Sequence, residues 1–256
     1  MELAPGVVTP GWFDTRAVAR RIPLPHDLSG QRCLDVGTFD GYWAFEMERR
    51  GASDVHAIDI LDPLQWDWPA DARPEDIGAI SARKGSGQGF EIARDALGST
   101  VVRHERSIYD VTESELGQFD FVFVGSLLLH LRDPIGALSQ LRSVCRGRIL
   151  IVDAVNPFLS VLSPKRPVST LDGRGRPWWW RPNVAGLVRM AEAAGFTKIG
   201  QANMFAMPAG PGQSRPSFHL RMLRHPSALS EGLRARVGDP HAAVMAMVKD
   251  SGASVG

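Results

Sequence analysis

The sequence is poor in cysteine, with only Cys33 and Cys145 among its 256 residues. The two lie far apart and form no Cys-x-x-Cys pair, which excludes a disulfide scaffold and a zinc ribbon and favours buried thiols in a reducing compartment. No apolar run approaches the roughly 20 residues that span a bilayer, and no basic segment followed by an apolar stretch marks a secretory signal. We therefore expect a soluble, cytoplasmic protein with no membrane partner.

The sequence also lacks an excess of charge of either sign. Lys and Arg total 29 and Asp and Glu total 28, so the net charge is +1. No global field therefore marks a protein that binds nucleic acid or a membrane surface. The 44% hydrophobic and 22% charged residues are ordinary globular values, which exclude wholesale disorder and a coiled coil.

Short β-prone runs alternate with helical patterns along most of the chain. This alternation predicts a doubly wound, Rossmann-like α/β sheet, mostly parallel, with an antiparallel strand pair near the end of the domain. We expect one domain at residues 1–225 and a tail at residues 226–256 that includes a short helix from Asp239 through Lys249. The expected strands are residues 32–36, 55–60, 101–104, 119–124, 149–154, 198–205 and 217–224, and the expected helices are residues 42–50, 90–97, 134–145 and 187–194.

Two stretches interrupt the alternation. Residues 61–89 are rich in Asp, Pro, Gly and Trp, and we interpret them as an insertion on the ligand side of the second strand. Residues 156–182 form a long loop rich in Pro, Gly and Arg. Loops of this length are uncommon in a compact domain and usually have a function.

A glycine turn lies where the first strand meets the first helix. Gly37 and Gly41 lie in this turn, which lets backbone N–H groups approach a ligand at the helix N-terminus. Their G-x-x-x-G spacing, with Phe39 between them, differs from the dinucleotide fingerprint and argues against NAD. Asp59 ends the second strand, where a carboxylate is well placed to accept both hydroxyls of a ribose.

Two further segments extend this pattern. Residues 119–134 read FDFVFVGSLLLHLRDP, and WWRPN at residues 179–183 is followed by AAGF at residues 193–196. With the glycine turn and Asp59, they resemble the class I S-adenosylmethionine-dependent methyltransferases over about residues 10–225. The branch they resemble includes uncharacterised bacterial methyltransferases and the tRNA wobble-uridine carboxymethyl transferases.

The resemblance implies a binding role for ten residues of this sequence. It implies S-adenosylmethionine as cofactor, held along the carboxyl ends of the strands. Asp35, Gly37, Thr38 and Gly41 would line its methionine end, Asp59 would bind the ribose, Ile60, Ser107 and Ile108 would contact the adenine, and Gly125 and Ser126 would lie near the sulfonium.

Methyl transfer requires a base only when the acceptor keeps its proton at neutral pH. His130 is the natural candidate because it closes the fourth-strand motif, although a structural histidine is the alternative. Tyr109 is a second candidate, unless its ring only covers the adenine. No metal site is expected, because no two histidines share helical spacing and the fourth strand ends in Gly125-Ser126.

Residues 165–189 contain six Lys and Arg residues against one acid, and they include three consecutive tryptophans. The segment is either a solvated basic loop or a lid that binds a planar or anionic acceptor through Trp179, Trp180, Arg176 and Arg181. We expect methyl transfer to a small molecule. Two alternatives stay open, namely an RNA-modifying methyl or carboxymethyl transferase and a non-catalytic cofactor-binding module.

Overall fold

The computed structural model describes residues 1–171, 173, 178–198, 200, 202–213 and 237–248. Its centre is an eight-stranded sheet with the order β10-β12-β7-β6-β3-β4-β5, and β11 also pairs with β12. Strands β3 to β7 are parallel, whereas β12 is antiparallel to each of its neighbours. The strands are β3 (Arg32–Val36), β4 (Asp54–Asp59), β5 (Val102–Glu105), β6 (Phe119–Gly125), β7 (Cys145–Ala154), β10 (Phe196–Lys198), β11 (Asn203–Met207) and β12 (Asp239–Val248). The predicted Rossmann-like fold is confirmed.

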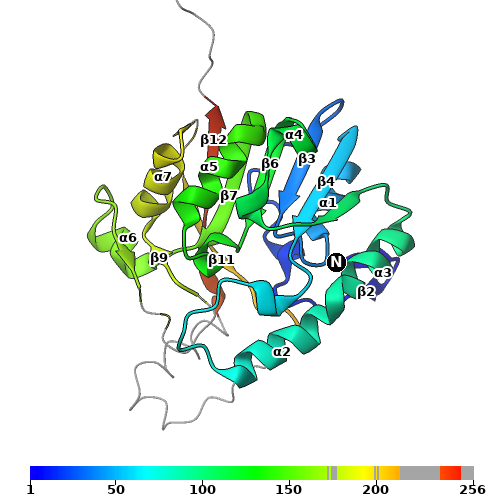
Figure 1. Cartoon of the computed structure of the whole chain (residues 1–256), viewed down its shortest axis with the longest axis horizontal. Helices are drawn as coiled ribbons and strands as arrows, with labels where there is room; N and C mark the ends of the chain where they lie inside the picture. Colours follow the sequence, from blue (N-terminus) through cyan, green and yellow to red (C-terminus); the bar gives the residue numbers. More distant parts are fainter. Residues whose placement is uncertain (172, 174–177, 199, 201, 214–236, 249–256) are drawn as a thin grey trace, which may run out of the picture.

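Helices cover both faces of this sheet (Figure 1). One buried cluster joins the sheet to α1 (Tyr42–Arg49) and α3 (Gln88–Leu97), and the other joins it to α5 (Pro134–Val144) and α7 (Val184–Ala193). Strand β6 contributes to both clusters, which explains its uninterrupted apolar sequence. Helix α5 begins as predicted, because the Asp133 side chain caps it by accepting a hydrogen bond from Gly136 N at 2.8 Å.

The end of the described chain differs from the prediction. The expected short helix from Asp239 is wrong, because these residues form β12, which lies between β7 and the β10 and β11 strands. The sequence is rich in Ala and Met, which favour helix, but burial against neighbouring strands overrides that preference. The sheet therefore extends beyond residue 225. The expected strand at residues 217–224 lies outside the described residues.

Shorter elements connect the layers. The insertion contains η2 (Pro63–Gln65), α2 (Pro74–Lys84) and η3 (Gly85–Gly87), and the long loop contains α6 (Pro157–Leu162), β8 (Ser169–Thr170) and β9 (Arg181–Pro182). The others are β1 (Glu2–Ala4), β2 (Val7–Val8), η1 (Thr15–Ala17), η4 (Ile108–Asp110), α4 (Glu113–Leu116) and η5 (Leu128–His130). None of the helices described here is long and apolar enough to cross a membrane.

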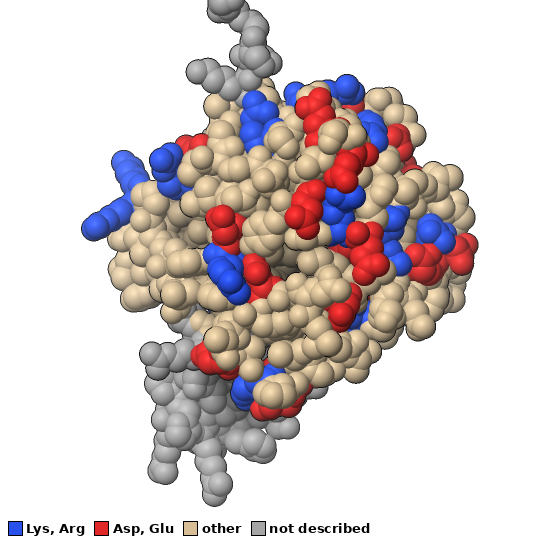
Figure 2. Space-filling model, viewed as in Figure 1, with Lys and Arg blue, Asp and Glu red and all other residues tan. Residues whose placement is uncertain are grey.

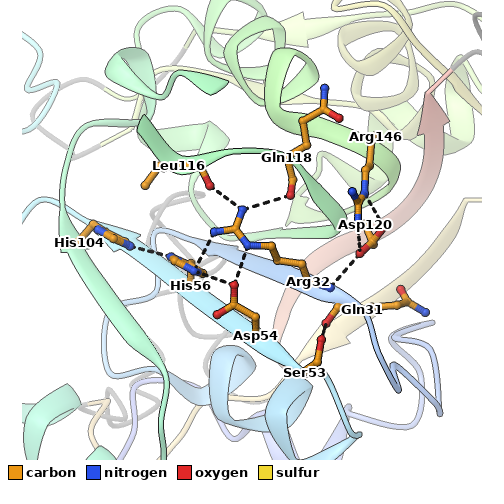
Figure 3. A network of polar contacts seen from close by, with 10 residues as sticks. All are labelled: Gln31, Arg32, Ser53, Asp54, His56, His104, Leu116, Gln118, Asp120 and Arg146. Atoms are coloured by element: carbon orange, nitrogen blue, oxygen red, sulfur yellow. Dashed lines mark hydrogen bonds and ion pairs between the residues drawn. The ribbon is translucent and has the colours of Figure 1, made fainter. Parts of the chain in front are cut away.

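A polar network centred on Arg32 joins the amino-terminal ends of β3, β4 and β6 (Figure 3). The guanidinium donates to Asp54 Oδ2 at 2.6 Å and to the carbonyls of Leu116 and Gln118 at 2.5 and 3.2 Å. The Arg32 backbone N–H donates to Asp120 Oδ2 at 2.9 Å. These contacts fix the strands at the end of the sheet opposite the carboxyl ends, where the predicted site residues lie.

Candidate functional site

The carboxyl ends of the parallel strands meet at one edge of the sheet, where ligands of open α/β sheets bind. Val36, Asp59, Gly125 and Ala154 end β3, β4, β6 and β7 there. Strand β12 runs the other way, so its beginning reaches the same edge and His241 lies opposite Ala154. Most of the predicted site residues therefore lie at this edge, together with His241 of β12.

The glycine turn is held to α1 by a buried carboxylate. Asp35 is 2% exposed and accepts hydrogen bonds from Thr38 Oγ1 at 2.6 Å and from Ala44 N at 3.1 Å. Burial raises the pKa of Asp35 to about 7, although both hydrogen bonds oppose the rise. Gly37 has a φ of +71°, and a Cβ there would lie 3.0 Å from Leu127 Cδ2. The turn is thus a preformed cradle that a larger residue would fill.

Asp59 is paired with a buried lysine that sequence reasoning missed. Its Oδ2 atom accepts a hydrogen bond from Phe39 N at 2.7 Å and forms an ion pair with Lys84 Nζ. Lys84 ends α2, is 2% exposed, and lies 4.4 Å from the centre of the Phe39 ring. The other oxygen, Oδ1, takes part in neither contact. The insertion is therefore anchored on the carboxylate predicted to bind a ribose.

A cavity of about 430 Å³ is lined by Ile60, the residue that directly follows Asp59. Ile60 and Ser107, both expected at an adenine, line it together with Gln65, Glu105, Arg106 and Asp110. Ile108 is buried at the start of η4, directly after Ser107. A glycine cradle, a carboxylate and a cavity of this size along one edge fit the methionine, ribose and adenine parts of S-adenosylmethionine.

Asp67, in the insertion, ties three distant segments together. Its Oδ2 atom accepts hydrogen bonds from Tyr109 Oη at 2.7 Å and from Arg132 N at 2.8 Å, and its carbonyl accepts one from Trp179 Nε1 at 2.6 Å. Burial, followed by the bond to Asp67, raises the pKa of Tyr109. Tyr109 therefore keeps its proton while its hydroxyl binds Asp67, and its role as a base stays a prediction.

The predicted acceptor residues lie against the loop that follows β6. Trp179 N donates to Leu129 O at 2.7 Å, and Trp180 Nε1 donates to Arg132 O at 3.0 Å. Arg181 is only 7% exposed, with its guanidinium carbon 5.6 Å from the centre of the Trp178 ring. Arg176 lies outside the described residues. The two tryptophans thus lie at the candidate site, whereas Arg181 is buried instead of facing solvent.

Ser126, the residue predicted near the sulfonium, contacts a histidine other than His130. Ser126 Oγ lies 3.0 Å from Nε2 of His241, whose side chain is 1% exposed. His130, at the end of η5, is partly exposed. No sequence motif pointed to His241, which falls in the expected tail. In the described ranges, no group of three or more His, Cys, Asp or Glu residues could hold a metal ion.

Comparison with known proteins gives one family. The family described as "Methyltransferase domain" matches residues 13–202. The chain is 27% identical over 180 residues to the tRNA U34 carboxymethyltransferase of Ectopseudomonas mendocina, covering 68% of this chain and 48% of that protein. It is 31% identical over 123 residues to the magnesium-protoporphyrin O-methyltransferase of Rhodobacter capsulatus, covering 47% and 43%. The chain thus spans about half the length of the curated relatives it matches.

A solved structure shows the same fold. The magnesium protoporphyrin IX methyltransferase of Synechocystis PCC 6803, solved with bound S-adenosylhomocysteine, superposes with a TM-score of 0.50 at 14% identity. The similarity covers 92% of this chain and 80% of that chain.

Proposed function

Because this chain belongs to the methyltransferase-domain family and S-adenosylmethionine is its cofactor, we propose that it methylates a small-molecule acceptor. The contacts of Asp67 carry this proposal. They join the insertion, the loop after β6 and Trp179, and we infer that these joined segments would close the acceptor side of the edge. An edge closed in this way suits a small molecule better than a folded RNA.

Chain residues hold and orient the reactants in this proposal. The turn from Asp35 to Gly41 would hold the methionine end of the cofactor, Asp59 the ribose, and Ile60 and Ser107 the adenine. When bound, the cofactor would supply an activated methyl group, whose carbon an aligned nucleophile would attack in line while the thioether leaves. The protein then has to align the acceptor and exclude water, which is a task for the closed segments around Asp67.

The surface supports a small acceptor as well. Basic and acidic side chains are interspersed on the face of the molecule shown in Figure 2, with no broad region of one sign. The net charge of the whole chain is +1. Neither feature is typical of a surface that tracks a phosphate backbone.

The direct test uses cell extract and methyl-labelled S-adenosylmethionine. The full chain is incubated with both, and the label is then partitioned among small molecules, RNA and protein. We expect label in the small-molecule fraction, insensitive to RNase. Label that appears only in RNA would replace this proposal with the second candidate.

The second candidate is RNA modification, by methyl or carboxymethyl transfer. The names of several relatives favour it, since they are tRNA U34 carboxymethyltransferases at 24–29% identity. Supplying a carboxylated cofactor and purified tRNA in the same assay tests this candidate directly.

Cofactor binding can be tested at Gly37. Gly37→Val places a side chain against Leu127 inside the cradle, so we expect the affinity for S-adenosylmethionine to fall at least about tenfold, or ~1.4 kcal/mol. Gly30→Val is the matched control, because Gly30 has a similar φ of +74° and nothing lies within 4 Å of its Cβ position. Both variants lose stability from backbone strain, but only Gly37→Val should weaken binding in calorimetry. Equal affinities would remove the turn from the cofactor site.

A further inference from the structure

Ser126 has a backbone conformation that serine rarely adopts. It directly follows β6 with a φ of +51°, the left-handed region, and it is one of three described non-glycine residues with positive φ. Such strain persists only where surrounding contacts enforce it, and it is concentrated at functional sites. Here it directs Ser126 Oγ to His241, a residue 115 positions further along the chain.

The hydrogen bonds of His241 define its proton-accepting nitrogen. Nδ1 lies 2.9 Å from the Asp239 carbonyl oxygen, which can only accept, so Nδ1 carries the proton. In the neutral ring, Nε2 is then the acceptor, and it faces the Ser126 hydroxyl at 3.0 Å. The imidazole is enclosed by the rings of Phe13 and Phe205, at centroid distances of 5.7 and 6.2 Å. Ser126 therefore connects this buried base to the edge of the sheet.

Asp153 interacts electrostatically with His241. The titratable groups around it are Asp153 of β7, Asp239 of β12 and His130 of η5, and the last acts on Asp153. Burial raises the pKa of Asp153, and positive charge on His241 opposes this rise. A positive charge on His241 would therefore favour the carboxylate form of Asp153.

The same carboxylate argues against a role for Ser126 as an acyl-accepting nucleophile. Such a nucleophile needs free backbone N–H groups close by to stabilise an oxyanion. The N–H groups of Leu127 and Leu128 instead donate to Asp153 Oδ2 at 3.0 and 2.7 Å. The geometry therefore does not fit Ser126 as an acyl-accepting nucleophile.

We propose that Ser126 and His241 form the proton-accepting pair of the methyl-transfer site, and that the acceptor is a neutral hydroxyl group. This inference rests on the proposed function and narrows its substrate class. A carboxylate or a neutral amine attacks without first losing a proton, whereas an alcohol or phenol benefits from a base at the site.

Methyl transfer in this proposal forms one bond, breaks another and moves one proton. A lone pair of the acceptor oxygen forms the bond to the methyl carbon, and the bond from that carbon to sulfur breaks with its electrons left on sulfur. The acceptor proton moves to Ser126 Oγ while the Ser126 proton moves to His241 Nε2. His241 later returns its proton to solvent through Ser126.

Two variants test the pair with the unlabelled small-molecule fraction of the extract as the source of acceptor and methyl-labelled S-adenosylmethionine as the methyl donor. His241→Gln keeps an acceptor for the Ser126 hydroxyl but cannot take up a proton, so kcat should fall roughly 10²–10⁴-fold and its decline at acidic pH should vanish. Ser126→Gly removes the hydroxyl and relieves the strained φ, so Tm should rise while kcat falls. Ser86→Gly is the matched control, because exposed Ser86 has a φ of +52° and the same relief should leave kcat unchanged.

Separate readouts distinguish the pair from the function. Mass spectrometry should find the label on oxygen, and label on nitrogen or sulfur would overturn the hydroxyl class. A normal kcat in stable Ser126→Gly would overturn the relay.

If no fraction takes up label although calorimetry shows cofactor binding, the proposed function fails by itself. The pair is then decided by NMR of labelled histidine, in which His241 should titrate and its titration should change in Ser126→Gly. A His241 ring that keeps one protonation state from about pH 5 to 9 would refute it.

Discussion

At the scale of single residues, the ion pair between Lys84 and Asp59 links the insertion to the candidate cofactor site. Both side chains are largely removed from solvent, at 1% and 9% exposure. Removing one partner of a buried pair leaves an uncompensated charge, which typically costs about 3–5 kcal/mol. The stability of α2 therefore depends on the carboxylate that is predicted to bind a ribose.

Lys84→Met should thus lower the free energy of unfolding by about 3 kcal/mol in urea denaturation. The double variant Lys84→Met with Asp59→Leu should recover most of this loss, because no buried charge remains. Arg83→Met, one position earlier on the same helix and exposed, should change stability by well under half as much. A double variant no more stable than Lys84→Met would show that the pair is not the source of the loss.

The raised pKa of Asp35 predicts that the free energy of unfolding falls as pH rises. Its folded-state pKa is raised from 3.8 to about 7, so the folded protein binds this proton more tightly than the unfolded chain does. The stability that Asp35 contributes is present below about pH 4 and is lost as pH rises through about 7. Asp35→Asn carries no such proton, so its stability relative to the natural protein should increase from pH 4 to pH 8. Denaturation curves at four pH values check this, and a constant difference would contradict it.

At the scale of elements, the insertion and the segment of Trp179 act as one unit through Asp67. Asp67→Ala removes the carboxylate that holds Tyr109 and Arg132, so the closed arrangement should loosen. We expect the KM for the acceptor to rise about tenfold, with cofactor affinity nearly unchanged, because the cradle of Gly37 lies elsewhere on the edge. Steady-state kinetics and calorimetry measure the two effects.

The control for this prediction is Glu75→Ala, on α2 of the same insertion. Glu75 is exposed, and its ion pair with Arg73 at 3.8 Å is weak. Its KM should match that of the natural protein. If Asp67→Ala and Glu75→Ala have the same KM for the acceptor, Asp67 has no role in acceptor binding.

At the scale of the whole molecule, β12 connects the outer strands β10 and β11 to the rest of the sheet. Ala242, Ala243 and Val244 are at most 1% exposed, and the strand joins β7 to β10 and β11. A chain ending at residue 238 should therefore lose its cooperative unfolding transition in calorimetry, since it exposes β7 and removes apolar burial from both faces. A chain ending at residue 248 keeps every described strand and should unfold cooperatively. Cooperative unfolding of the shorter chain would show that β12 is dispensable.

Much of the architecture was determined by local sequence. The apolar run of β6 follows from burial on both faces, and the start of α5 follows from Asp133 and Pro134. The glycine turn and Asp59 identified one edge of the sheet as the candidate site, because parallel strands end together there. These features depend on neighbours within a few residues, or on the periodicity of a single element, so they can be predicted without the fold.

Only the tertiary structure decided the remaining features. An Ala- and Met-rich segment forms β12 because it pairs with β7, whose residues lie 87 to 99 positions earlier in the chain. Pairing with that strand outweighs helix propensity. Lys84 reaches Asp59, and His241 reaches Ser126, through contacts between residues 25 and 115 positions apart. A buried charge or a proton-accepting nitrogen takes its character from such partners and from the loss of water around it, and neither is encoded near the residue in the chain.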